Sequence, residues 1–323
     1  MKLLLSAAAA AFALTVAAPA ALAQTTPTPA PATPAPAAEP TVIEVREDGM
    51  VMRMFVPAGL QGRAPAIVVL GGSEGGIDGS SRVAKRLAQA GYVSLAIAYF
   101  AVDGLPPALI EIPIETFDKG LNWFERRPEV DSGRIGMIGV SKGAEAALIA
   151  ASRRSEIAAV VAGVPSNVVW QGIDQSDWTK VKSSWSSGGQ PLAFVPYAPS
   201  AEFKGIRDIY DRSMRPEGQE GDAVIPVERI NGDILLVSAG QDGLWDSTGM
   251  SRRIVARLNA QNFPHSVEHL DYPTAGHGVV GGPVTLEQAQ QLTQVGGTPE
   301  GNYAARQEVW TRVLAFFDRT LRH

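Results

Sequence analysis

A single serine lies between two glycines in the stretch Gly139-Val140-Ser141-Lys142-Gly143. The stretch follows the apolar run RIGMI and precedes an alanine-rich run, which predicts a sharp turn from a strand into a helix. Glycines two positions before and after the serine suit such a turn, because their backbones almost touch and a Cβ would clash. The pattern therefore predicts a nucleophilic serine beside the positive end of a helix.

A serine hydroxyl needs a general base at neutral pH, and the chain has four histidines. His277 lies in YPTAGHGV, on a glycine-flanked loop directly after an expected strand, and is the predicted base. His265 and His269 lie within that expected strand and are interpreted as surface or packing residues. His323 is the terminal residue and is a weaker candidate.

A histidine base is held in one tautomer by an acid, and in sheets of this kind the acid lies between the serine and the histidine in sequence. Asp242 follows the apolar run ILLVSAG in the stretch GQDGLWDS and is the favoured acid. Asp246, four residues later, is the alternative. Asp233 and Asp271 are interpreted as cap or turn residues.

An oxyanion needs two backbone N–H donors. The first is expected from Lys142, which directly follows the serine. The second is expected from Gly72 or Ser73 in the loop LGGSEGG, whose glycines let the backbone approach a substrate closely. A plain turn is the alternative interpretation of this loop. Nucleotide binding is not expected, because no G-K-[ST] follows.

The surrounding chain alternates between short apolar runs and helical patterns, which predicts an α/β fold. The expected strands cover 66–70, 92–100, 134–140, 157–164, 233–240 and 265–273, and the expected helices cover 81–90, 113–127, 141–154, 248–262 and 305–321. Such alternation is typical of a mostly parallel, doubly wound sheet with helices on both faces. Ligand sites in these sheets lie at the C-terminal ends of the strands, where the predicted serine, acid and base also lie.

Residues 165–230 interrupt this alternation, since they are rich in Ser, Gly, Pro and Trp and show weak periodicity. We interpret them as a partly irregular excursion over the domain, after the half that carries the serine. Trp170 and Trp185 within it, together with Trp245, are candidates to line a substrate pocket. Ordinary packing of the excursion onto the domain is the alternative for these side chains.

The N-terminal segment 1–23 has a lysine, an uncharged apolar core and the small residues ALA, which predicts a secretory signal peptide cut after Ala23. The cleavage motif argues against a membrane anchor. Segment 24–40 is rich in Pro, Ala and Thr, which predicts an extended linker, and segment 41–323 is the expected catalytic domain. The protein is therefore predicted to be exported, to the periplasm or beyond.

Composition excludes several function classes. The net charge is −5 without a basic stripe, so nucleic-acid binding is not indicated. The absence of cysteine and of an H-E-x-x-H motif gives no support to a metal site, a thiolate nucleophile or disulfides. No cofactor is expected, and the sequence gives no oligomeric state.

The motifs GVSKGAEAAL, GGSEGG, GQDGLW and YPTAGHG together resemble those of the alpha/beta hydrolases. More narrowly, SNVVWQGI and SSWSSGGQPLAFVPY are similar to a stretch in the C-terminal catalytic domain of acyl-CoA thioester hydrolases and bile acid-CoA:amino acid N-acyltransferases. Dienelactone hydrolases share the fold. The resemblance extends from about Ile43 to the C-terminus, and it implies a triad of Ser141, Asp242 and His277.

These observations predict a serine hydrolase that cleaves a small-molecule acyl thioester or ester through an acyl-enzyme. A general carboxylesterase or dienelactone hydrolase-like enzyme is the first alternative, and an acyltransferase to an amine or alcohol is the second. A non-catalytic protein that kept the fold is a third hypothesis, which the full set of triad candidates disfavours.

Overall fold

The computed structural model describes residues 38–177, 179–199 and 202–322. The chain divides into two units, Met1–Ala37 and Ala38–His323. The predicted signal peptide and linker residues 24–37 lie outside the described residues, as does His323. No helix in the described ranges is long and apolar enough to cross a membrane.

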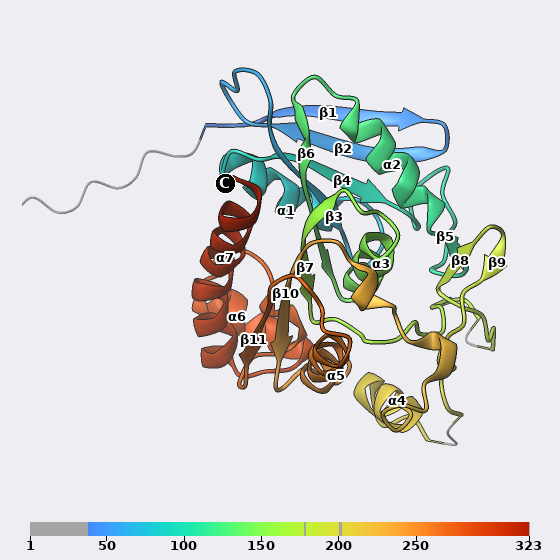
Figure 1. Ribbon diagram of the computed structural model, residues 1–323. Coiled ribbons are helices and arrows are strands. Elements are labelled where there is room, and N and C mark those ends of the chain that lie inside the picture. Colours follow the sequence, from blue (N-terminus) through green and yellow to red (C-terminus); the bar gives the residue numbers. More distant parts are fainter. Residues whose placement is uncertain (1–37, 178, 200–201, 323) are drawn as a thin grey trace, which may run out of the picture. The chain divides into compact units, whose positions relative to one another are not determined.

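An eight-stranded sheet forms the centre of the second unit (Figure 1). Its strands in chain order are β1 (Thr41–Glu47), β2 (Met50–Val56), β3 (Ala64–Leu70), β4 (Val93–Ala98), β6 (Val130–Val140), β7 (Ile157–Gly163), β10 (Asp233–Ala239) and β11 (Val267–Tyr272). Their order across the sheet is β1-β2-β4-β3-β6-β7-β10-β11. The pairs β1–β2 and β2–β4 are antiparallel, and every later pair is parallel.

The parallel strands are apolar on both faces because helices cover both sides of the sheet. In β3, for example, all seven residues are buried. The helices are α1 (Asp78–Gln89), α2 (Glu115–Glu125), α3 (Lys142–Ala151), α4 (Ile206–Ser213), α5 (Ser247–Ala260), α6 (Leu286–Leu292) and α7 (Pro299–Leu321).

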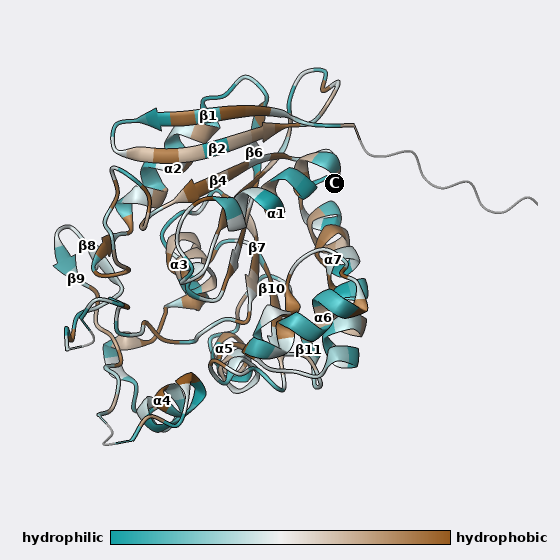
Figure 2. Ribbon diagram, turned by 180° about the vertical axis from the view of Figure 1, so that it is seen from behind, coloured by the Kyte–Doolittle hydropathy of each residue, from teal (hydrophilic) through white to brown (hydrophobic). Residues whose placement is uncertain are grey.

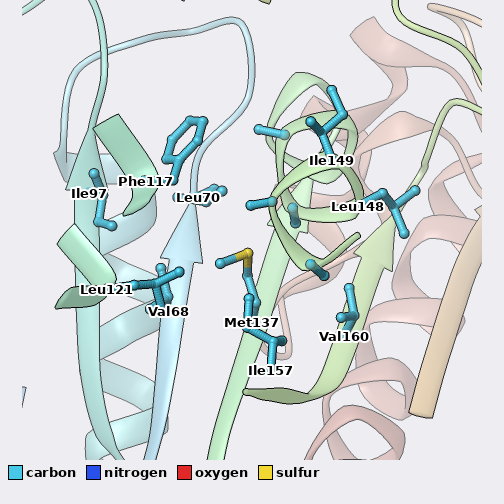
Figure 3. Packing of buried hydrophobic residues seen from close by; sticks show 14 of the residues in the cluster. Val68, Leu70, Ile97, Phe117, Leu121, Met137, Leu148, Ile149, Ile157 and Val160 are labelled. Carbon is cyan, nitrogen blue, oxygen red and sulfur yellow. The ribbon is translucent and has the colours of Figure 1, made fainter. Parts of the chain in front are cut away.

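Two hydrophobic clusters hold the layers together, one on each face of the sheet. Helices α2, α3 and α5 contribute to the first and helices α1 and α7 to the second. Figure 3 shows side chains of α2 and α3 packed against strands β3, β4, β6 and β7 in the first cluster. The sheet is thus sandwiched, and its C-terminal edge is left to the loops that carry polar residues.

The segment between β7 and β10 leaves the alternating pattern. It contains β8 (Trp185–Ser187), β9 (Gln190–Pro191), helix α4 and the short helices η1 (Gly221–Ala223) and η2 (Val227–Arg229). Strands β8 and β9 form a small sheet with β5 (Ile112–Pro113), which precedes α2. Helix α4 lies outside the two helical layers, beyond α5 (Figure 1).

The predicted fold class is confirmed, and each predicted strand of the sheet is present to within a few residues. Helices α4 and α6 were not predicted as separate elements. Helix α6 has the sequence LEQAQQL and is coloured largely hydrophilic in Figure 2. It lacks an apolar stripe to reveal it, and it is instead begun by a capping box between Thr285 and Gln288.

Candidate active site

Ser141 occupies a strained turn between β6 and α3. Its backbone angles are φ 58° and ψ −125°, a conformation that a non-glycine residue adopts only when the surroundings enforce it. A Cβ on Gly139 would lie 2.0 Å from the carbonyl oxygen of Gly143, and one on Gly143 would lie 2.2 Å from that of Gly71. Both flanking glycines are therefore required by backbone contacts, as the sequence pattern predicts.

Asp242 and His277 lie together at the C-terminal edge of the sheet. Asp242 follows β10, and His277 begins the short helix η3 (His277–Val279) after β11. Nδ1 of His277 is 2.9 Å from each carboxylate oxygen of Asp242, and both residues are buried. An acid in this position holds the imidazole with its proton on Nδ1 and leaves Nε2 to accept one.

The other ring nitrogen of His277 is buried and has no hydrogen-bond partner among the described residues. A buried polar atom without a partner is rare in a stable structure and calls for an explanation. His277 and Ser141 are each only 8% exposed, and both follow C-terminal ends of strands of the same sheet. An Nε2 left free in this way is suited to take a proton from a reacting hydroxyl.

Trp245 supports this pair from two sides. Its backbone N–H donates to Oδ1 of Asp242 at 3.2 Å, beside that of Leu244 at 2.9 Å. Its ring packs edge-on against His277 with centroids 5.6 Å apart, while its indole N–H donates to the carbonyl of Val164. Asp242 and His277 are thus both contacted by Trp245, the first through its backbone and the second through its ring.

Asp246, the alternative acid, caps a helix instead of contacting His277. Its side chain accepts the N–H of Gly249 at 3.1 Å and caps the start of helix α5. Of the other two histidines described, His269 lies in β11 beside Ser238, and His265 precedes that strand beside Asn231. None of these three residues contacts the Asp242–His277 pair.

Hydrogen bonds in the loop after β3 distinguish between Gly72 and Ser73 as candidate oxyanion donors. The N–H of Gly72 donates to the carboxylate of Glu74 at 3.1 Å, and the hydroxyl of Tyr99 donates to the carbonyl of Gly71 at 2.5 Å. Ser73 lines the same cavity as Ser141, and its N–H meets no acceptor among the described residues. The amide of Lys142 is also available, because the first residue of a helix has no intrahelical acceptor. Ser73 is accordingly the better candidate of the two loop residues.

A cavity of about 880 Å³ opens above Ser141. Its wall is mostly apolar and comes largely from the segment between β7 and β10. The mouth carries three exposed apolar side chains, among which Phe203 is 70% exposed. Its lining includes Ser73, Gln171, Val181, Phe203, Ile206 and Trp245. Much of this wall is irregular chain, so no periodic pattern indicated which of its side chains line the cavity.

The three candidate tryptophans divide between two roles. Trp245 lines the cavity, whereas Trp170 and Trp185 do not. Trp185 is fully buried against Tyr99 and donates its indole N–H to Glu145 at 2.7 Å. Trp170 is fully buried against Tyr210, behind the cavity wall. Both therefore pack the excursion onto the domain.

Sequence reasoning missed a buried ion pair in the helix that follows Ser141. Nζ of Lys142 is 2.6 Å from Oε2 of Glu145, and both side chains are almost inaccessible. Burial, which disfavours the charged forms, lowers the pKa of Lys142 and raises the pKa of Glu145 against their mutual attraction. A signal was present, since KGAEAALIAA is apolar on every side and must be buried, charges included.

The described residues contain no group of three or more His, Asp or Glu side chains that could hold a metal ion. The site is thus built from a serine, a histidine, a carboxylate, backbone amides and an apolar cavity. Such an arrangement can perform acyl transfer by a covalent route.

Comparison with known proteins agrees with this chemistry. Residues 112–323 match the family described as BAAT / Acyl-CoA thioester hydrolase C terminal. The chain is 28% identical over 286 residues to a peroxisomal succinyl-coenzyme A thioesterase and 30% identical over 297 residues to acyl-coenzyme A thioesterase 6, both from Mus musculus. Each alignment covers 86% of this chain, and the chain spans 65% of the length of either relative.

Among solved structures, the fold is similar to that of a putative dienelactone hydrolase from Klebsiella pneumoniae. The TM-score is 0.55 at 16% sequence identity, with 87% of this chain and 98% of the other covered. This likeness shows the alpha/beta-hydrolase fold.

Proposed function

Because the chain belongs to the BAAT / acyl-CoA thioester hydrolase C-terminal family, we propose that it is a serine hydrolase of acyl thioesters or esters. One observation carries the proposal. The Asp242–His277 pair keeps a buried, unpartnered Nε2 at the sheet edge where Ser141 stands in a strained turn below an apolar cavity. A plain structural histidine would have a partner for that nitrogen.

In the first half of the reaction, Oγ of Ser141 attacks the carbonyl carbon of the substrate. The proton of the hydroxyl passes to Nε2 of His277, and the imidazolium is stabilised by Asp242. The amides of Lys142 and Ser73 donate to the oxyanion of the tetrahedral intermediate. The intermediate then collapses to the acyl-enzyme, and His277 gives its proton to the departing thiol or alcohol.

In the second half, a water molecule attacks the acyl-enzyme. His277 takes a proton from the water, and the same two amides hold the new oxyanion. Collapse releases the carboxylic acid, and the proton on His277 returns to Oγ of Ser141. The cycle consumes one water and leaves the protein unchanged.

The size and apolar lining of the cavity indicate that it binds the acyl part of the substrate. Its volume of about 880 Å³ lies in the range of ordinary ligand sites, and an apolar wall with few polar groups suits a hydrocarbon chain. The relatives named above act on acyl-CoA thioesters according to their names. The predicted export would separate the protein from intracellular CoA, so esters and other thioesters are included in the proposal.

Two alternatives share the same acyl-enzyme. A general carboxylesterase would accept esters but not thioesters. An acyltransferase would pass the acyl group to an amine or alcohol instead of water, and the family description includes such enzymes. We place hydrolysis first, because water needs no acceptor site beyond the one that the cavity provides.

The test compares the wild-type protein with Ser141→Ala on two panels of matched chain length, acyl-CoA thioesters and p-nitrophenyl esters. Labelling with a fluorescent fluorophosphonate is measured in parallel. We expect turnover and labelling in the wild type and loss of both in the variant, with unchanged thermal unfolding. Full activity in Ser141→Ala would refute the proposed nucleophile, and turnover of esters alone would favour the carboxylesterase.

A further inference from the structure

The proposed mechanism makes no use of the side chains of Lys142 and Glu145, although they form a buried ion pair one residue from the nucleophile. Removing two charges from water is costly, and an apolar pair of similar size often stabilises a fold equally well. Helix α3 is otherwise apolar, with all its residues buried. Stability alone therefore does not account for a carboxylate at this position.

Glu145 uses both of its oxygens. Oε2 accepts from Nζ of Lys142, while Oε1 accepts from the backbone N–H of Trp170 at 3.1 Å and from the indole N–H of Trp185 at 2.7 Å. The two tryptophans belong to the excursion, the segment that supplies most of the cavity wall. Trp170 is followed directly by Gln171, which lines the cavity.

The same contacts reach the loop of the candidate oxyanion donor. The ring of Trp185 packs against that of Tyr99, with centroids 5.6 Å apart. The hydroxyl of Tyr99 donates to the carbonyls of Gly71 and Gly72 at 2.5 and 3.2 Å. One carboxylate thus joins the nucleophile helix to the cavity wall and, through Trp185, to the loop after β3.

We propose that Glu145 is a positioning residue that holds the acyl-binding wall of the cavity in register with Ser141, with Lys142 as its counter-ion. This inference rests on the proposed function and adds a determinant of acyl-chain selectivity to it. A chain that extends along the wall depends on the register between wall and nucleophile. An acetyl group is too short to reach far along the wall and depends on it less.

The measurement is kcat and KM for p-nitrophenyl acetate and p-nitrophenyl decanoate, expressed as the decanoate-to-acetate ratio of kcat/KM. In Glu145→Gln only one acceptor oxygen remains, so the amide nitrogen faces either the Lys142 ammonium or the two tryptophan donors, and one set of hydrogen bonds is lost. Losing hydrogen bonds to a charged group is expected to lower the ratio about tenfold, mainly through KM for decanoate. Trp185→Phe keeps an aromatic ring and removes one donor, so a smaller fall of about threefold is expected.

A rescue variant distinguishes a loss of positioning by Glu145 from general damage to the fold. In the double variant Lys142→Met/Glu145→Gln the facing ammonium is gone, and the amide oxygen can accept from both tryptophans. We expect this variant to recover most of the ratio that Glu145→Gln loses. The matched control is Glu220→Gln, which breaks the ion pair (2.8 Å) between the buried Glu220 of the excursion and Arg253 of α5 without touching α3. This control should leave the ratio at the wild-type value.

An unchanged ratio in folded Glu145→Gln and Trp185→Phe would overturn the inference, as would an equal fall in Glu220→Gln. A double variant no better than the single one would also overturn it. If Glu145→Gln does not fold, the decanoate-to-acetate ratio of Trp185→Phe tests the inference in its place. A wild-type protein that turns over neither ester and resists fluorophosphonate would refute the proposed function itself, which distinguishes the two failures.

Discussion

Replacing Asp242 by asparagine should stop catalysis while leaving the fold in place. Oδ1 of Asp242 accepts the backbone N–H groups of Leu244 and Trp245. In Asp242→Asn the side-chain carbonyl must take over this position, because the amide nitrogen cannot accept. The amide nitrogen then occupies the place of Oδ2, 2.9 Å from Nδ1 of His277.

We expect this geometry to invert the histidine tautomer, because Oδ1, although also 2.9 Å from Nδ1, already accepts two backbone N–H groups. The new amide donates to Nδ1, so the imidazole proton moves to Nε2, which can no longer accept a proton from Ser141. Loss of correctly placed general base catalysis and of the imidazolium partner is expected to lower kcat by about 10³- to 10⁴-fold. That loss corresponds to roughly 4–5 kcal/mol of transition-state stabilisation.

The effect on stability should be far smaller. Both backbone hydrogen bonds persist in the variant, and one charge-assisted bond becomes a neutral one, which costs about 1–2 kcal/mol. The assay is kcat/KM on a p-nitrophenyl ester together with the thermal unfolding midpoint. Asp246→Asn is the matched control, since this residue is half-exposed and asparagine caps a helix about as well as aspartate, so the change should cost at most about 1 kcal/mol without affecting kcat.

Two results would contradict this prediction. If Asp242→Asn kept more than a tenth of the wild-type kcat, Asp242 would not set the tautomer of His277. If Asp246→Asn instead lost activity at an unchanged unfolding midpoint, the acid would be the other aspartate.

Two further predictions concern stability. In Gly143→Ala the new Cβ would lie 2.2 Å from the carbonyl oxygen of Gly71, so the unfolding free energy should fall by about 3 kcal/mol or more. The control Gly133→Ala has its nearest contact at 3.4 Å and should lower the unfolding free energy only slightly. Equal unfolding midpoints for the two variants would contradict this prediction. Burial lowers the pKa of His269 below its ordinary value of 6.5, against attraction from Asp271, so the unfolded chain binds the proton more tightly and stability should fall as the pH drops below about 6.5. His269→Gln should therefore show a smaller loss of unfolding midpoint between pH 7.5 and 5.5 than the wild type, and an identical pH dependence would argue against this role.

The local features of the candidate site could be predicted from the sequence. The strand–turn–helix around Ser141 could be predicted, because only glycine fits at Gly139 and Gly143 and this requirement is visible in five residues. The parallel sheet could be predicted as well, since buried strands are continuous apolar runs. Asp242 and His277 were favoured by their positions directly after such runs.

The long-range features could not be predicted in the same way. The structure was needed to choose between Asp242 and Asp246 as the acid, because it shows that Asp242 contacts His277 and that Asp246 caps α5. Ser73 could be preferred over Gly72 as the oxyanion donor only once the structure showed that the side chain of Glu74 accepts the Gly72 N–H. Both distinctions depend on side-chain hydrogen bonds that leave no periodic trace.

The composition of the cavity wall and the contacts of Glu145 depend on how distant segments of the chain pack together. The wall is assembled from irregular chain and from α4, a helix of only eight residues that contributes Ile206, Ile209 and Tyr210. Glu145 is fully buried and joins α3 to tryptophans that lie 25 and 40 positions further along the chain. Local patterns report how a segment folds against the sheet, whereas contacts across such separations depend on how the finished elements pack together.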